Sequence, residues 1–223
     1  MAACSSEPLL GPETNQQDSA SQPDPAPEER PPVRDGMWIG SSELAALPTS
    51  GPAWRRLLAR ADAPCGSVAL SDQEQQNNVC VMAKALVYAR TGDAPYLPEV
   101  LEALGEIAEG NPYHGRALAL GRELAAYVIA ADLVGLEGLD PELDVAFRAA
   151  LRELLRTHTS GGPSTLVECH ERRPNNWGTH CGASRAAVAA YLGDGVELAR
   201  VARVFHGWLG DRSAYAGSVY GDV

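Results

Sequence analysis

The 223-residue sequence has no run of about 18 apolar residues, the length that a membrane-spanning helix needs. It also has few basic residues: 18 Lys and Arg stand against 29 Asp and Glu, a formal net charge of −11. Because phosphate binding requires a basic face, this charge argues against nucleic acid as a partner. Such an acidic surface would repel a polyanion at long range, so an anionic substrate would need a local basic pocket.

Metal-ligand spacing is absent as well. The five cysteines form no C-x-x-C pair and no clustered Cys/His quartet, so we expect no metal and no other cofactor. Cys4 is a candidate for lipidation, as described below, and the other four cysteines allow three disulfide pairings. We expect these four to be buried free thiols: Cys65, Cys80, Cys169 and Cys181.

The N-terminal stretch differs in composition from the rest of the chain. Residues 5–36 are rich in Pro, Ser, Gln and Glu, hold seven acids against two bases, and precede the first aromatic residue, Trp38. Such a segment buries too little apolar surface to offset its ordering entropy, which predicts a disordered linker. We therefore divide the chain into a linker region, 1–36, and a folded domain, 37–223.

The first residues, Met-Ala-Ala-Cys-Ser-Ser, resemble the cleavage box of a bacterial lipoprotein signal, in which Cys4 would be lipidated. The basic and apolar regions of a signal peptide are missing, so either translation starts further upstream or the match is fortuitous. The resemblance implies a periplasmic or cell-surface lipoprotein, or a secreted protein, attached to a membrane only through a lipid on Cys4.

From Trp38 onward the apolar residues recur at helical spacing, and no window alternates as a strand would. The predicted helices cover residues 52–61, 72–90, 95–108, 114–134, 141–157, 176–192 and 196–209. Their short connections predict antiparallel neighbours. The expected fold is all-α, with helical hairpins in a bundle, a solenoid or part of an (α/α) toroid; no repeat of fixed length supports a solenoid.

One segment, residues 170–180, packs polar, cationic and amide side chains ahead of an Ala-rich helix. In that helix Asn176 and His180 are four residues apart and share a face. A second ridge of small residues would let another helix approach closely: Gly178, Gly182, Ala186 and Ala190.

Three arginines near this segment would supply the local basic pocket: Arg172, Arg173 and Arg185. Their charge should lower the pKa of His180, because an imidazolium is disfavoured beside like charge. These residue types suit β-elimination in a uronic-acid polymer. Amide, imidazolium or guanidinium donors neutralise the carboxylate, a base removes the C5 proton, and an acid protonates the departing O4.

The run Asn-Asn-Trp-Gly-Thr-His-Cys-Gly-Ala-Ser-Arg (175–185) resembles the Asn-Asn-His-type motif of alginate lyases and related uronan lyases with helical toroid folds. Weaker similarities lie at residues 47–51, at Trp54, at Gly121-Arg122 and at Tyr127, and the likeness spans about 37–223. The resemblance implies a metal-independent polysaccharide lyase acting on an anionic polysaccharide such as alginate or glucuronan. It also implies that the chain forms the N-terminal part of an (α/α) toroid.

The resemblance assigns Asn176 to neutralising the uronate carboxylate and His180 to assisting there or acting as the base. Substrate contacts are expected from Asn175 and Trp177 and from the three arginines. Trp177 stands where the more familiar motif has histidine. It therefore stays open whether His180 assists in neutralising the carboxylate or acts as the base.

Such lyases also use an Arg and a catalytic Tyr from a later Asp-Gly-x-Leu-Pro-like segment, which we expect beyond Val223. The nearest candidates within the chain are Arg212, Tyr215 and Tyr220.

Other interpretations remain open. The Asn pair could be only a helix N-cap, and Trp177 and Trp208 could be core residues rather than sugar platforms. Asn77 and Asn78 could line the same cleft. No role is assigned to the other histidines: His114, His158, His170 and His206.

Two other function classes are a non-catalytic glycan-binding helical module and a glycoside hydrolase on the same toroid. The hydrolase needs two carboxylates roughly 5–9.5 Å apart, for which Glu168 and Glu171 are the only pair near the motif.

Overall fold

The computed structural model describes residues 36–110 and 112–217. This part folds into ten α-helices and one short 3-10 helix, and it contains no strand, only an isolated bridge between Arg116 and Ser160. The prediction of an all-α fold is confirmed; the toroid arrangement stays a prediction. The helices are α1 (Ser41–Ala46), α2 (Gly51–Ala61), α3 (Asn77–Thr91), η1 (Ala94–Tyr96), α4 (Leu97–Ala108), α5 (Ala117–Val134), α6 (Leu136–Leu139), α7 (Pro141–Arg156), α8 (Leu166–Arg172), α9 (Asn176–Leu192) and α10 (Gly195–Trp208).

Local signals explain the ends of the long helices. The Asp140 carboxylate accepts a hydrogen bond from Leu143 N at 3.0 Å and caps α7, and Gly92 ends α3 in the left-handed conformation, with φ 74°. The helix predicted from residue 72 begins only at Asn77. Asp72 Oδ1 accepts from Glu74 N at 3.0 Å, and such local bonds favour a turn over a helix. The short helices α1, α6 and α8 were not predicted because few residues give no readable periodicity.

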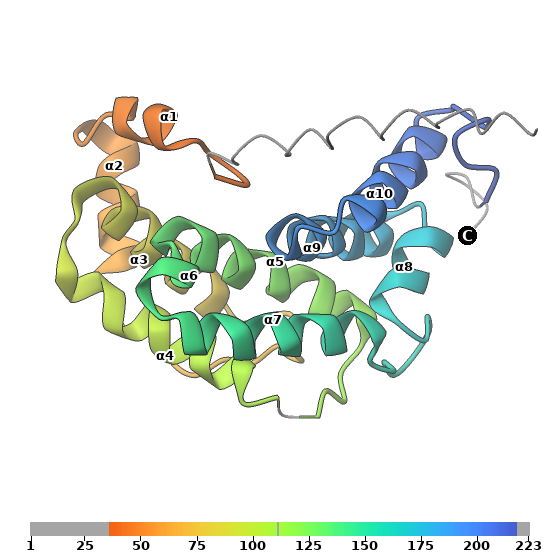
Figure 1. The fold of residues 1–223 in the computed structure, drawn as a ribbon, viewed down its shortest axis with the longest axis horizontal. Helices are drawn as coiled ribbons and strands as arrows, with labels where there is room; N and C mark the ends of the chain where they lie inside the picture. Colours follow the sequence, from red (N-terminus) through yellow and green to blue (C-terminus); the bar gives the residue numbers. More distant parts are fainter. Residues whose placement is uncertain (1–35, 111, 218–223) are drawn as a thin grey trace, which may run out of the picture. The chain divides into compact units, whose positions relative to one another are not determined.

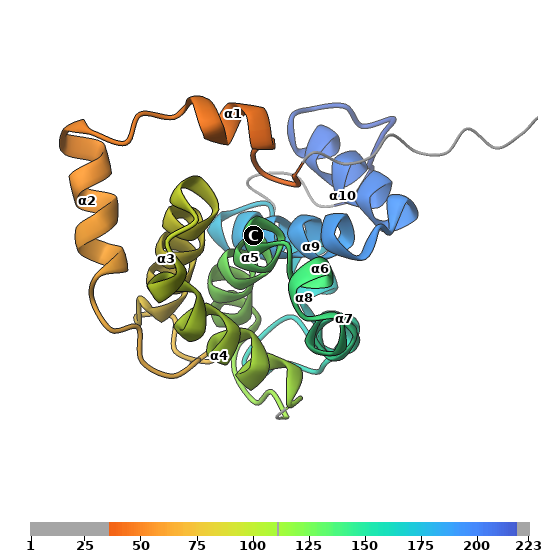
Figure 2. The ribbon, with the colours of Figure 1, turned by 60° about the vertical axis from the view of Figure 1, so that its left-hand side comes forward.

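Helix α5 lies at the centre of the domain, packed between α3 and α9, while α4 and α7 pack against each other (Figures 1 and 2). Large apolar side chains from these helices form the core, including Leu104, Leu124, Tyr127 and Phe147.

The contact between α5 and α9 is unusually close. A methyl group on Gly121 would lie only 2.7 Å from the backbone nitrogen of Cys181. Ser184 Oγ donates to Gly121 O at 2.8 Å and accepts from Ala125 N at 3.0 Å, while Cys181 Sγ donates to Ala117 O at 3.4 Å. Because these pairs advance together along both helices, α5 and α9 run in the same direction.

The cysteines divide into two kinds. Cys65 and Cys80 form a disulfide, with their Cα atoms 5.3 Å apart, so the expectation of a free thiol is wrong for these two. The segment between α2 and α3 folds back and brings Cys65 to the first turns of α3. The spacing of the cysteines in the sequence does not predict this contact. Cys169 and Cys181 are buried free thiols, as expected.

None of the helices in the described ranges is long and apolar enough to cross a membrane. The predicted linker, apart from Gly36, and the lipidation candidate Cys4 lie outside the residues that the structure describes.

Candidate functional site

Asn176 and His180 lie on the exposed side of α9, one turn apart, while the opposite side of the helix is buried against α5 and α8. The structure therefore brings the two central candidates together at the surface, as the sequence predicted. Asn175 is the N-cap of α9, and its side-chain oxygen accepts a hydrogen bond from Trp177 N at 3.0 Å. Its amide is thus used in starting the helix.

His180 has Arg122 of α5 as its cationic neighbour. The pKa of His180 is lowered, first by partial burial and second by the positive charge of the Arg122 guanidinium. The direction agrees with the sequence prediction, but the arginine responsible is not one of the three near residues 170–185. Arg122 also forms a loose ion pair with Glu74, with Nη1 and Oε1 3.8 Å apart. An exposed amide and an exposed imidazole therefore lie on α9, with a guanidinium of α5 near the imidazole.

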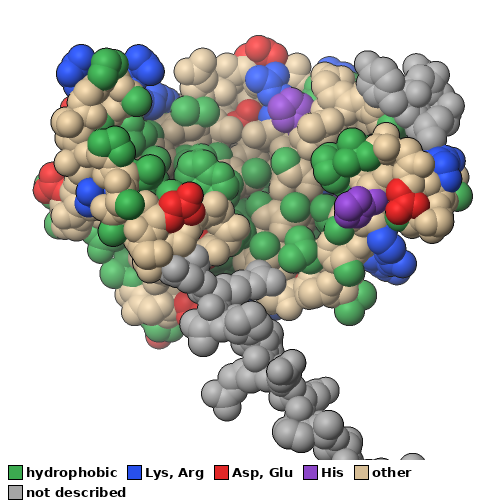
Figure 3. All heavy atoms as spheres, turned by 90° about the horizontal axis from the view of Figure 1, so that it is seen from above, with side chains coloured by type: hydrophobic (Ala, Val, Ile, Leu, Met, Phe, Trp, Pro, Cys, Tyr) green, Lys and Arg blue, Asp and Glu red, His purple; other side chains and the backbone are tan. Residues whose placement is uncertain are grey.

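Seen from above in Figure 3, the molecule presents a hollowed face lined largely by hydrophobic side chains. Two histidines are visible on this face, each near charged side chains. Apolar walls with a few polar groups are typical of ligand-binding surfaces.

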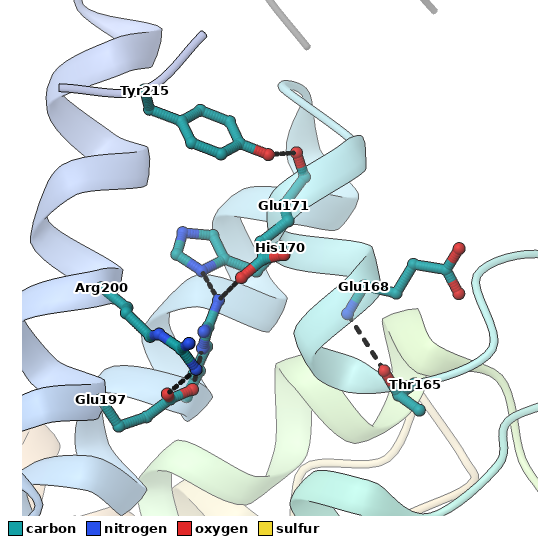
Figure 4. Close-up of polar contacts among 8 residues, drawn as sticks. Thr165, Glu168, His170, Glu171, Glu197, Arg200 and Tyr215 are labelled. Atoms are coloured by element: carbon teal, nitrogen blue, oxygen red, sulfur yellow. Dashed lines mark hydrogen bonds and ion pairs between the residues drawn. The ribbon is translucent and has the colours of Figure 1, made fainter. Parts of the chain in front are cut away.

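Arg185 is fully buried, which corrects the expectation that it contacts the substrate. Its Nε donates to Glu197 Oε1 at 2.5 Å, and its Nη1 donates to Glu171 Oε1 at 3.0 Å. The same Nη1 lies 3.2 Å from Nδ1 of His170. Figure 4 shows Glu171 and His170 of α8 and Glu197 of α10 converging on one point. The guanidinium thus joins α8, α9 and α10, because a buried charge requires such partners.

His170 is part of the same buried cluster. Its ring meets the Trp208 ring edge to face, with centroids 5.1 Å apart, and a methyl group on Gly182 would lie 2.7 Å from the imidazole. Burial first, and then the Arg185 charge, lower the pKa of His170 to about 4. Trp208 therefore packs against a neutral histidine. The small residues of α9 do permit close approach, as the sequence predicted.

The two arginines before α9 have different surroundings. Arg172 is exposed and forms an ion pair with Glu168, with Nη1 2.7 Å from Oε1. Arg173 lies over the Trp177 ring, with its Cζ 5.7 Å from the ring centroid, and Arg116 lies over the same ring at 4.7 Å. Trp177 thus makes cation–π contacts with two arginines.

Glu168 and Glu171, the pair considered for glycoside hydrolysis, are both engaged in structural contacts. Hydrogen bonds from Ser164 lower the pKa of Glu168, and Glu171 accepts from Arg185. A hydrolase needs one carboxyl group with a raised pKa to act as the acid, whereas the pKa of Glu168 is lowered.

The C-terminal candidates also have structural partners. Tyr215 donates from its hydroxyl to the Glu171 carbonyl at 2.7 Å (Figure 4), and Arg212 donates to the carbonyls of Ala216 and Gly217, both at 2.8 Å. Tyr220 lies outside the described residues.

Sequence reasoning missed Glu123, which is buried beside Arg122 and accepts a hydrogen bond from Gln75. Burial raises its pKa to about 7. The available signal was a carboxylate in the mostly apolar stretch 117–134, whose other charged residues are Arg122 and Asp132. Asn78 is buried and donates to the Arg122 carbonyl at 3.4 Å, so its amide holds α3 to α5 instead of facing a cleft.

A pocket of about 530 Å³ lies elsewhere and is lined by none of residues 170–180. Val68, Tyr113, His114 and Glu153 are among its lining residues. This pocket also holds an imidazole, that of His114, among carboxylates such as Glu153. We place the candidate site on the exposed face of α9 because an amide and an imidazole lie one turn apart there, within the segment that carries the motif.

Within residues 36–110 and 112–217, no group of three or more His, Cys, Asp or Glu side chains is arranged to hold a metal ion. Comparisons with models of known families, with curated proteins and with solved structures find no match.

Proposed function

We propose that this chain is part of a polysaccharide lyase that cleaves a uronic-acid-containing polymer, of the alginate or glucuronan type, by β-elimination. The observation that carries the proposal is the exposed arrangement of Asn176 and His180 on α9 with Arg122 of α5 beside the imidazole. An (α/α) toroid and export as a lipoprotein or secreted protein belong to the same proposal.

In the proposed reaction the Asn176 amide and the Arg122 guanidinium donate hydrogen bonds to the uronate carboxylate and stabilise the charge that develops when C5 loses its proton. His180, whose pKa is lowered, is neutral near pH 7 and accepts that proton. The C4–O4 bond then breaks and leaves a C4–C5 double bond, while an acid protonates O4. We assign that acid to none of the described residues, because Tyr215 already donates to a carbonyl.

Near-ultraviolet absorbance tests the proposal, because elimination creates an unsaturated uronide. We expect the whole protein that contains this chain to produce this absorbance on at least one of a panel of purified uronans. His180→Ala should lower kcat roughly 100-fold or more, the usual scale for a positioned acid–base group. Asn176→Ala should have a similar effect by removing a donor to the carboxylate.

His206→Ala is the matched control, because His206 is an exposed histidine on α10 and has no part in the proposed reaction. Full activity of both α9 variants would overturn the assignment. New reducing ends without absorbance would indicate a hydrolase, and binding without either product would indicate a glycan-binding module.

A further inference from the structure

Arg116, Trp177 and Arg173 meet at one indole ring, although they belong to three separate elements. Arg116 is the N-cap residue of α5, Arg173 is the C-cap residue of α8, and Trp177 lies in the first turn of α9. The two Cζ atoms are 4.7 Å and 5.7 Å from the ring centroid. Both distances are within the range of a cation–π contact. The fold therefore gathers two positive charges at the N-terminal ends of α5 and α9.

Neither guanidinium has a carboxylate partner in the part of the chain that the structure describes. Among the described residues, no carboxylate oxygen lies within 4.0 Å of Arg116 or Arg173, and neither side chain has a hydrogen-bond partner. The chain offers a direct comparison in Arg148, which lies 4.6 Å over the Tyr191 ring. Arg148 also binds Asp144 at 2.6 Å, as expected for a stack that serves only the fold. The Trp177 cluster lacks that counter-charge.

The ring itself is fixed in place. Trp177 is half-buried and packs against the main core. Gly161 and Gly162 pass beside the cluster, and methyl groups on them would lie 3.8 Å from the Arg116 side chain and 3.5 Å from the indole. These two glycines therefore place no side chain over the guanidinium groups.

We propose that Arg116 and Arg173, held by Trp177, bind the carboxylate of a second uronate residue on the same polymer. This inference rests on the proposed function and names a further subsite for it. A guanidinium stacked on a ring keeps its N–H edge free, and that planar edge matches a carboxylate in two parallel hydrogen bonds. An ammonium group or a single surface charge would lack this geometry.

The position of the cluster agrees with a polymer that continues from the site at His180. Along α9, Trp177 precedes His180 by three residues, or about 4.5 Å, and along α5, Arg116 precedes Arg122 by six residues, or about 9 Å. Both displacements point toward the N-terminal ends of two helices that run in the same direction. The inference requires that a linear chain with one carboxylate per sugar reach both places. The pair also supplies local positive charge in a protein whose formal net charge is −11.

The test is affinity electrophoresis of the whole protein in gels that contain alginate, glucuronan or a neutral glucan. We expect the double variant Arg116→Gln with Arg173→Gln to bind at least tenfold more weakly to the uronan that retards the unmodified protein. Its migration in the neutral glucan should not change. Arg152→Gln, an exposed arginine of α7, removes charge outside the cluster and should bind like the unmodified protein. Replacing both cluster arginines by lysine should recover only part of the affinity, because the charge returns without the planar fork.

Trp177→Leu is the second arm, because it removes the platform while both charges remain. We expect weaker uronan binding with circular dichroism unchanged; unaltered binding in this variant and in the double variant would overturn the inference. In the lyase assay the double variant should raise KM and keep kcat, the opposite of His180→Ala.

The two proposals can fail separately. If the protein forms no unsaturated product but loses uronan binding in the double variant, the lyase function fails and the subsite stands. If the protein is an active lyase and the double variant binds like Arg152→Gln, the subsite fails and the function stands. A protein that no uronan retards overturns the subsite.

Discussion

His170 and Glu123 are both buried, and burial shifts their pKa values in opposite directions. For His170 the pKa falls from its ordinary value of 6.5 to about 4, so between these values the unfolded chain binds more protons than the folded one. Its contribution to stability is therefore present above pH 6.5 and is lost as the pH falls toward 4. At about 1.4 kcal/mol per pH unit, the loss is about 3 kcal/mol.

Glu123 behaves in the reverse sense. Its pKa rises from 4.5 to about 7, so the folded state keeps a proton that the unfolded chain has already released. The corresponding stability is present below pH 4.5 and is lost as the pH rises through 7, again by about 3 kcal/mol. Because the two windows nearly coincide, the two contributions offset each other in the unmodified protein.

Substitution of Glu123 should reveal the pH dependence of stability that comes from His170. Glu123→Gln keeps the size of the side chain and an acceptor for Gln75 but cannot titrate. We expect its free energy of unfolding, relative to the unmodified protein, to increase by about 3 kcal/mol from pH 4.5 to 7. Urea unfolding at several pH values, with the slope m checked for constancy, measures this difference.

Glu153→Gln is the control, because Glu153 is exposed on α7. Its stability curve should run parallel to that of the unmodified protein across the same range. If the Glu123→Gln curve is also parallel, within about 0.5 kcal/mol, the reasoning from burial is refuted, because the carboxyl group would then titrate alike in the folded and unfolded states.

Gly121→Ala should destabilise the protein by roughly 1–3 kcal/mol in thermal unfolding, because the added methyl group would meet the α9 backbone at 2.7 Å. Gly105→Ala, in α4 with no atom within 4 Å of the added methyl group, should instead stabilise it by up to about 1 kcal/mol; equal effects would contradict the close packing. Cys65→Ser breaks the disulfide to α3, whose sequence separation is 15, and should cost about 3 kcal/mol in urea unfolding; unchanged stability would argue against the bridge. Arg122→Gln should raise the pKa of His180 in an NMR titration, since a like charge is removed; an unchanged pKa would show that Arg122 does not act on the imidazole.

Much of the fold could be predicted because it depends on neighbouring residues. The apolar spacing of α7 and α9, the capping side chains Asp140 and Asn175, and Gly92 at the end of α3 are local signals, and the helices follow them. Short helices and the delayed start of α3 were missed because a few residues carry little periodicity and the turn at Asp72 competes with the helix.

For the candidate site, the sequence alone determined that Asn176 and His180 share one face of a helix, since a spacing of four residues places them there. Only the tertiary structure decided which cations surround them. Arg185, close by in sequence, is buried between carboxylates, whereas Arg122, 58 residues before His180, lies beside the imidazole. The disulfide between Cys65 and Cys80 was decided in the same way. Helical periodicity specifies the direction of a side chain from its own helix, but its burial and its partners depend on how distant helices pack, and for α5 and α9 that packing depends on Gly121.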